Sequence, residues 1–214
     1  RVIEQDEGRR LVGVSIDVTA EYSAAETREM MIREMNHRVK NLFAIISSMI
    51  GLRARSHTSV PDFATDLRER IASLGRAHSL ATPRPDADTV NLGELFRTVL
   101  SPYQQHASIL IDGPIVQISR DHLSPLALIF HEWATNAAKY GGLKDGGGVT
   151  VSWEQSDDAL NIAWTEELSA PFTASSDVGF GTRLIQSSVR QMGAETSTDV
   201  EGTDLTLRLK LPAK

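Results

Sequence analysis

The sequence predicts an α+β protein in which a helical hairpin is followed by a domain of mixed strands and helices. Three observations support this fold class. Apolar residues recur with helical spacing in the first part of the chain, strand and helix patterns alternate from Val90 onward, and a proline-rich stretch at residues 82–88 separates the two parts. A chain of 214 residues with 41% hydrophobic residues is long enough to bury a core.

Composition excludes several classes of protein. A formal net charge of −6 argues against a protein that neutralises nucleic-acid phosphates. The absence of cysteine excludes disulfides, thiolate metal sites and cysteine nucleophiles, and it is compatible with the reducing cytoplasm, where we expect the protein. No apolar run approaches the roughly 20 residues that span a bilayer, so we expect no membrane segment in this chain.

Residues 11–19 have the pattern of a strand, because β-branched residues from Val12 to Val18 alternate with smaller or polar ones. A lone strand cannot fold by itself, so we expect another segment, inside or outside this sequence, to complete its sheet. The segment resembles the last strand of a PAS-type sensor domain. Residues 1–19 are therefore interpreted as a sensor remnant, with an ordinary edge strand or a disordered leader as the alternative.

A long helix is predicted from about residue 20 to residue 55, because the segment lacks proline and its glycine lies near its end. Counted in heptads, His37 falls at position f, and Glu34 and Asn41 share its outer face. We therefore expect solvent to reach His37. The opposite face carries apolar residues three or four positions apart, as in the seam of a helical bundle: Ile32, Met35, Val39, Leu42, Ile46 and Met49.

A second helix is predicted after Pro61 and Asp62, and it ends near residues 82–85. The short break between the two helices favours an antiparallel hairpin over residues 20–85. One hairpin alone buries its seam poorly, so the seam needs a further partner. A second copy would give a homodimeric four-helix bundle, and a monomer could pack the seam within the chain against a sensor domain. The helical spacing of the second helix is set by Phe63, Leu67, Ile71, Leu74 and His78.

Residues 34–41, Glu-Met-Asn-His-Arg-Val-Lys-Asn, resemble the phosphoacceptor box of the HWE histidine kinases. The resemblance implies that His37 accepts a phosphoryl group. An acceptor histidine must be open and flanked by groups that tolerate negative charge, as Arg38 and Lys40 do. Asn41 either orients the imidazole or contacts the phosphoryl group, and a plain surface role is equally open.

From Val90 onward, helices are predicted at residues 92–106, 121–140 and 182–192, and strands at 109–111, 116–118, 149–154, 160–164, 195–200 and 204–211. The second of these helices has two distinct faces. One is apolar and carries Leu126, Phe130, Trp133 and Ala137. The other carries a carboxylate, an amide, an ammonium group and a phenol, from Glu132, Asn136, Lys139 and Tyr140.

Residues 131–141 resemble the N box of the GHKL ATPases in its HWE form, which implies a Bergerat-type α/β-sandwich ATP-binding domain over residues 86–214. By this resemblance Asn136 holds Mg²⁺ through its side-chain oxygen, a hard ligand that suits this cation. Lys139 faces the phosphates, Tyr140 lines the nucleotide site, and Glu132 supports catalysis. His131 is expected to have a structural or supporting role.

Residues 164–166, Trp-Thr-Glu, resemble the family's Trp-x-Glu element and imply that Glu166 accepts a hydrogen bond from adenine. The sequence then departs from the pattern, because residues 167–171 are Glu-Leu-Ser-Ala-Pro where the family usually continues with paired glycines and a proline. Residues 179–182, Gly-Phe-Gly-Thr, resemble the glycine box at a helix start, where backbone N–H groups bind phosphate. Gly179, Gly181 and Thr182 are the residues so assigned, and Arg183 is a further candidate phosphate contact.

These resemblances predict a sensor histidine kinase core that uses ATP and Mg²⁺. It would phosphorylate His37 and pass the group to an aspartate in the receiver domain of a response regulator, under the control of an upstream sensor domain. Two alternatives are open: a GHKL ATPase that hydrolyses ATP or phosphorylates a protein hydroxyl, with the hairpin only as a dimer support, and a catalytically silent adaptor that docks partners.

Overall fold

The structure is a computed structural model that describes residues 2–5, 8–11, 16–19, 22–23, 25–26, 28–30, 32–33, 36, 39–40, 43, 46–47, 50, 59–80, 89–105, 107–144, 147–169 and 180–213. The chain divides into two compact units, residues 1–45 and residues 46–214, and each is described by itself. None of the described helices has both the length and the apolar character needed to cross a bilayer.

In the first unit, β1 (Val2–Gln5) pairs antiparallel with β2 (Gly8–Leu11). The strand predicted at residues 11–19 is wrong at residues 16–19, which are not in a strand, and its residues 12–15 lie outside the described part of the chain. The preceding charged segment supplies the partner strand. At the other end Asp17 accepts a hydrogen bond from the backbone N–H of Thr19 at 2.9 Å, which favours the start of a helix over extended chain. The described positions from residue 22 to residue 50 are helical, as predicted.

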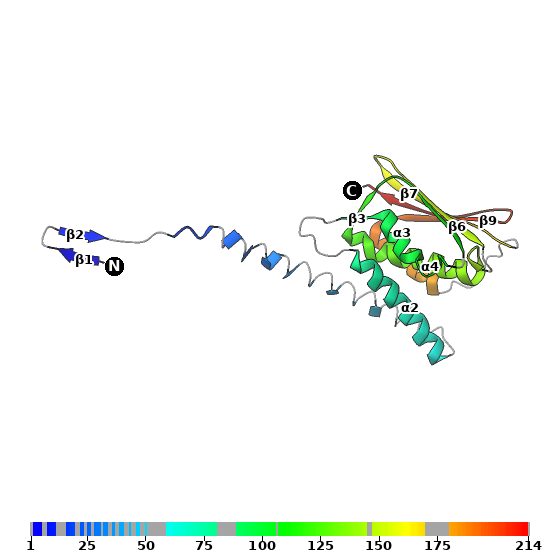
Figure 1. Cartoon of the computed structure of the whole chain (residues 1–214), viewed down its shortest axis with the longest axis horizontal. Coiled ribbons are helices and arrows are strands. Elements are labelled where there is room, and N and C mark those ends of the chain that lie inside the picture. Colours follow the sequence, from blue (N-terminus) through cyan, green and yellow to red (C-terminus); the bar gives the residue numbers. More distant parts are fainter. Residues whose placement is uncertain are drawn as a thin grey trace. The chain divides into compact units, whose positions relative to one another are not determined.

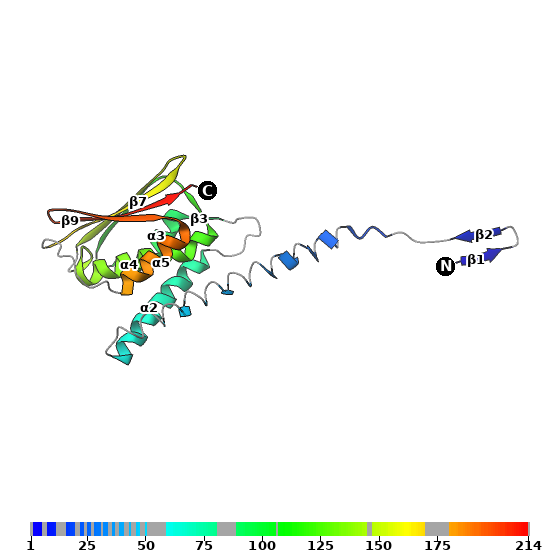
Figure 2. The ribbon, with the colours of Figure 1, turned by 180° about the vertical axis from the view of Figure 1, so that it is seen from behind.

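The second unit is built on a five-stranded sheet with the order β4-β6-β7-β9-β8, in which only the β4–β6 pair is parallel. Its strands are β4 (Ser108–Asp112), β6 (Gly148–Gln155), β7 (Ala159–Glu167), β8 (Glu195–Glu201) and β9 (Asp204–Pro212). Its helices are α2 (Val60–Ser79), α3 (Leu92–Leu100), α4 (Arg120–Tyr140) and α5 (Phe180–Met192). In Figures 1 and 2 these helices lie on one side of the sheet.

The core lies between α3, α4 and the inner face of the sheet. Phe96 of α3 stacks on Phe130 of α4 with ring centroids 4.1 Å apart, and on Trp153 of β6 at 5.6 Å. Trp133 of α4 meets Trp164 of β7 edge to face at 6.0 Å. Aromatic pairs of this kind contribute about 0.5–1.5 kcal/mol beyond the area that they bury. The apolar face predicted for α4 is therefore confirmed as the part of the helix that packs on the sheet.

From residue 89 onward the predicted elements agree with the structure, with two corrections. The helix predicted at residues 92–106 ends at Leu100, where Pro102 lacks the N–H that would continue it. A short strand, β3 (Thr89–Asn91), was not predicted; it pairs antiparallel with β5 (Gln117–Ser119). Asn91 is also the N-cap of α3, accepting from the N–H of Glu94 at 3.1 Å.

Helix α2 begins where Pro61 and Asp62 predicted, with the proline in its first turn, and it ends at Ser79, earlier than expected. It packs against α3 and α4. Of the residues that set its predicted helical spacing, Leu74 is the one that is buried. The face buried in the unit consists of Asp66, Arg70, Ser73, Leu74 and Ala77, whereas Ile71 remains 39% exposed. The choice of buried face is set by tertiary contacts, because Arg70 of α2 and Glu132 of α4 form an ion pair where the two helices pack.

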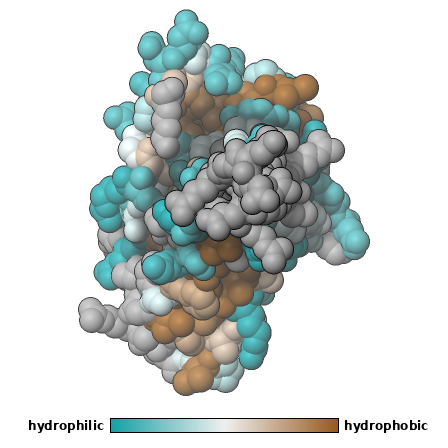
Figure 3. Space-filling view, turned by 90° about the vertical axis from the view of Figure 1, so that its left-hand side faces the viewer, coloured by the Kyte–Doolittle hydropathy of each residue, from teal (hydrophilic) through white to brown (hydrophobic). Residues whose placement is uncertain are grey.

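Apolar side chains also remain on the described surface, such as Leu110 on the edge strand β4 and Ile115 in the loop that follows it. On the face that Figure 3 shows, hydrophobic residues are interspersed with hydrophilic ones. Scattered exposure of this kind is normal for a folded domain and does not by itself mark a binding surface.

Candidate nucleotide site

Glu132 lies at the centre of the candidate site, on the middle of α4. The sequence places it on the polar face of the helix, and the structure buries it to 2% exposure. Its Oε1 forms an ion pair with the guanidinium of Arg70 on α2. Arg70 in turn donates to both carboxylate oxygens of Asp66, one turn earlier on the same helix, at 2.8 and 3.3 Å. A buried guanidinium therefore stands between two carboxylates, the arrangement that makes burial of charge tolerable.

The other carboxylate oxygen of Glu132 faces the start of α5. A Cβ added to Gly181 would lie 2.6 Å from Glu132 Oε2, closer than real Cβ atoms come to other atoms. Glycine at position 181 thus lets the first turn of α5 approach the carboxylate. Three elements, α2, α4 and α5, meet at this one side chain.

Glu166, near the end of β7, is held in place by two hydrogen bonds within the same domain. It is 2% exposed, and its Oε2 accepts the backbone N–H of Gly142 at 2.6 Å. Its Oε1 accepts the indole N–H of Trp164 at 3.2 Å. A Cβ added to Gly141 would collide with the Glu166 carboxylate, so the turn after α4 closes directly onto it. Burial raises the pKa of Glu166 above its ordinary value, and the two hydrogen bonds act in the opposite direction.

The remaining predicted residues on α4 and α5 are accessible. Asn136, Lys139 and Tyr140 are exposed on the last two turns of α4, and Thr182 and Arg183 are exposed in the first turn of α5. These side chains are free to reach a ligand beside the start of α5, where backbone N–H groups and the positive end of the helix dipole favour phosphate. The polar face predicted for α4 therefore divides, with Glu132 turned inward and the other three residues outward.

His131 is buried next to Glu132. Its Nε2 lies 3.5 Å from the hydroxyl oxygen of Thr135. Burial, followed by the positive charges of Arg70 and Arg76, lowers the pKa of His131 from 6.5 to about 4, and Asp66 acts in the opposite direction. The ring is therefore neutral at physiological pH, which supports the structural role expected for it.

Three predicted residues lie outside the described part of the chain: His37, Asn41 and Gly179. The segment after Glu166, in which the sequence departs from the family pattern, is described only to residue 169. Near His37 on the first helix, Asn36 and Lys40 are helical and exposed. The exposure of His37 itself stays a prediction.

Among the described residues, no group of three or more His, Cys, Asp or Glu side chains is arranged to hold a metal ion. A magnesium ion held by one amide oxygen and by substrate phosphates does not need such a group. Asn136 has an exposed amide, and Gly181 lets the start of α5 approach Glu132, which lies one turn before Asn136. This arrangement fits that mode of binding.

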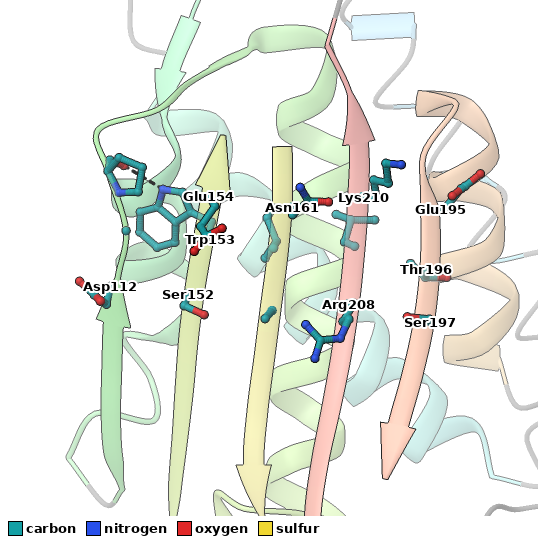
Figure 4. Close-up of a pocket in the computed structure, with 15 residues that line it drawn as sticks. Asp112, Ser152, Trp153, Glu154, Asn161, Glu195, Thr196, Ser197, Arg208 and Lys210 are labelled. Atoms are coloured by element: carbon teal, nitrogen blue, oxygen red, sulfur yellow. Dashed lines mark hydrogen bonds between the residues drawn. The ribbon is translucent and has the colours of Figure 1, made fainter. Parts of the chain in front are cut away.

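The structure also has an open groove of about 820 Å³, but it lies elsewhere. Figure 4 shows it on the face of the sheet that is turned away from the helices. Asp112, Ser152, Asn161, Ser197 and Arg208 project into it from the five strands. None of the predicted site residues lines this groove, so it is separate from the candidate nucleotide site.

Sequence reasoning missed Arg70 and Asp66. The available signal was their spacing of four residues, which places both on one helix face with Ser73 and Ala77. Without the structure, that face has the pattern of an ordinary solvated salt bridge.

Known proteins resemble this chain in sequence and in structure. A family model described as "HWE histidine kinase" matches residues 34–115. "Blue-light-activated histidine kinase 1" of Erythrobacter litoralis is 31% identical over 203 residues, which cover 92% of this chain and 56% of that protein. A "Blue-light-activated histidine kinase" of Rhizobium johnstonii is also 31% identical, over 88% of this chain and 56% of its own length. The chain thus spans about half the length of these curated relatives.

A solved structure shows the same fold. The "Erythrobacter litoralis EL346 blue-light activated histidine kinase" superposes with a TM-score of 0.64 at 19% identity, covering 85% of this chain and 62% of that one. The α+β architecture predicted from the sequence, a helical segment followed by a GHKL-type domain, is confirmed by this likeness. With the family match and the curated relatives, these findings show that the chain belongs to the HWE histidine kinase family.

Proposed function

We propose that the chain is the kinase core of a sensor histidine kinase, which transfers the γ-phosphoryl group of ATP to His37. A ring nitrogen of His37 bonds to the γ-phosphorus as the bond from that phosphorus to the bridging oxygen breaks, and ADP leaves. The phosphohistidine then donates the group to an aspartate in the receiver domain of a response regulator. Membership of a histidine kinase family implies the use of ATP.

One observation carries this proposal. Three motifs are far apart in the sequence, and in the fold the one at residues 131–141 lies against Glu166 of the second and against Gly181 of the third. The turn after α4 binds Glu166 through the N–H of Gly142, and the start of α5 lies against Glu132. A site that binds adenine at one end and phosphates at the other requires this meeting of elements.

The proposed roles follow from exposure and chemistry. Asn136 would hold Mg²⁺, which when bound neutralises phosphate charge and orients the transferred group. Lys139, Arg183 and the N–H groups around Gly179, Gly181 and Thr182 would bind phosphates, with Tyr140 at the rim. The carboxylate of Glu166 would accept a hydrogen bond from the adenine amino group, through lone pairs that its bonds to Gly142 and Trp164 do not use. Glu132 would support catalysis, and Asn41 would orient His37.

We propose the same organisation as the sequence suggested: a sensor remnant at residues 1–19, the hairpin at 20–85 and the ATP-binding domain at 86–214. In the full-length protein an upstream sensor domain would control the hairpin. A homodimer and a monomer both fit the seam of the first helix, and a cytoplasmic location remains a prediction from composition.

The test is incubation of the chain with γ-labelled ATP and Mg²⁺. We expect label that is labile in acid and stable in base, absent from His37→Ala and retained in a His78→Ala control, which removes an exposed histidine of α2. Label that survives His37→Ala would exclude this acceptor. Bound nucleotide without any label would favour an adaptor, and release of phosphate without label would favour an ATPase.

The magnesium assignment has its own test. Asn136→Ala should abolish Mg²⁺-dependent labelling while leaving the unfolding free energy nearly unchanged, because the side chain is exposed. The exposed Asn161→Ala on the opposite face of the sheet is the matched control and should label normally. Full labelling by Asn136→Ala would mean that another group binds the metal.

A further inference from the structure

The buried face of α2 has a polar half and an apolar half. Asp66, Arg70 and Ser73 occupy the first half, with exposed fractions of 8%, 3% and 1%, and Leu74 and Ala77 occupy the second. Apolar contacts alone would bury such a helix more cheaply, since charged groups lose hydration when they leave water. The polar half therefore needs a reason other than the burial of area.

Arg70 is the residue on which the polar half converges. Its guanidinium is bound to Asp66 on its own helix and to Glu132 on α4. Arginine suits this position because its planar fork presents several N–H donors in fixed directions to two carboxylates at once. Asp66 fixes the fork, and the fork then fixes the carboxylate of Glu132.

The two oxygens of Glu132 have separate surroundings. Oε1 is held by Arg70, whereas Oε2 lies against the first turn of α5 beside Gly181. A carboxylate held at one oxygen cannot rotate freely, so the direction of the other oxygen is set as well. That direction is towards the helix start that carries the predicted phosphate-binding residues.

We propose that Arg70 is a positioning residue for the phosphoryl transfer. It orients the Glu132 carboxylate towards the phosphate end of the site and supplies the counter-charge that this buried group needs. The inference rests on the proposed function, because it concerns the same reaction. It adds that an orienting group of the ATP-binding domain is supplied by the hairpin helix α2, so Glu132 is oriented only while α2 is docked on α4.

The experiment uses the full chain and five variants: Arg70→Met, Arg70→Lys, Glu132→Gln, the double variant Arg70→Met/Glu132→Gln, and Arg68→Met, which removes an exposed arginine of the same helix as the matched control. The rate at which acid-labile label appears is measured as a function of ATP concentration. Urea unfolding of the same variants measures the coupling between Arg70 and Glu132 independently of any reaction.

We expect Arg70→Met to lower the maximal rate roughly 10- to 100-fold, the scale of a small misplacement of a reacting or orienting group. The ATP concentration for half-maximal rate should change by less than about twofold, since Arg70 acts on the transition state and not on binding. Arg70→Lys should restore part of the rate, and Arg68→Met should match the wild type. In the Glu132→Gln background, Arg70→Met should cause no further loss, because the residue acts through Glu132.

Three results would overturn the proposal. An equal loss in the wild-type and Glu132→Gln backgrounds would assign Arg70 a merely structural role. A faster reaction in Arg70→Met would mean that the contact between Arg70 and Glu132 slows the transfer. An unchanged rate would mean that this contact does not affect the transfer. If Arg70→Met does not fold, Arg70→Lys and Asp66→Asn, which loosens the guanidinium, decide by the same criteria. Absence of label on the wild-type chain would refute the proposed function and, with it, the role of Arg70 in the reaction. Coupling between Arg70 and Glu132 in urea would in that case show only that the contact forms.

Discussion

Replacement of His131 by glutamine should remove a pH-dependent part of the stability of this protein. The ring is buried, and its pKa falls from 6.5 to about 4, through desolvation first and then the charges of Arg70 and Arg76. A histidine with a lowered pKa binds its proton more readily in the unfolded chain. Its contribution to stability is therefore complete above pH 6.5 and is lost as the pH falls from 6.5 towards about 4.

The size of the effect follows from the shift. Each unit of pKa difference corresponds to about 1.4 kcal/mol, so the complete loss is about 3 kcal/mol, and at about pH 5 roughly 2 kcal/mol is already gone. His131→Gln keeps a polar group near Thr135 but has no charge to gain. The difference in unfolding free energy between wild type and variant should therefore shrink by about 2 kcal/mol between about pH 8 and pH 5.

Urea unfolding followed by tryptophan fluorescence at several pH values measures this difference, because the three tryptophans are buried in the same domain. Carboxylates titrate in the same range in both proteins and cancel in the comparison. The variant His78→Gln controls for the loss of an exposed imidazole. Parallel curves for wild type and His131→Gln over the whole range would refute the argument from burial.

Three further substitutions test the packing of the site. Gly181→Ala should cost about 1–3 kcal/mol in urea unfolding, because the new methyl group meets Glu132, whereas Gly75→Ala on α2, with no atom within 4 Å of its added Cβ, should not destabilise. Glu166→Gln places an amide where two donors point, and should cost about 1–3 kcal/mol. Burial raises the pKa of Glu166, so the wild type loses stability as the pH rises through that pKa, and the cost of the variant should shrink with rising pH. Phe96→Ala should cost about 3–5 kcal/mol, measured in the same way, because the ring is fully buried.

The sequence predicts the ATP-binding half of the fold well because its signals are local. Helix α4 was expected at residues 121–140 and spans residues 120–140, since its apolar residues recur with a clear helical period. Strands β6, β7 and β9 alternate apolar and polar residues, and their predicted positions lie within a few residues of those observed. The three-residue strand β3 was missed because so short a segment has no measurable period.

The site was less predictable than the fold, for a physical reason. The motif on α4 singled out Glu132, and periodicity placed it on the polar face of the helix together with residues that prove to be exposed. Whether a carboxylate is exposed or buried depends on what packs over it, and here that is a helix about 60 residues earlier in the chain. No pattern within α4 contains that information. The same reasoning explains why Arg70 was overlooked, since its role exists only in the docked helix.

The two faces of α2 give this contact its significance. Phe63, Leu67 and Ile71 follow one another at helical spacing on one face, and Asp66 and Arg70 lie on another. Successive residues are turned by about 100° around a helix, so a rotation of α2 by a single residue would carry the guanidinium away from α4. Whatever packs on the apolar face therefore acts on the same rigid helix that orients Glu132. A change in that packing has a direct physical route to the phosphate end of the site.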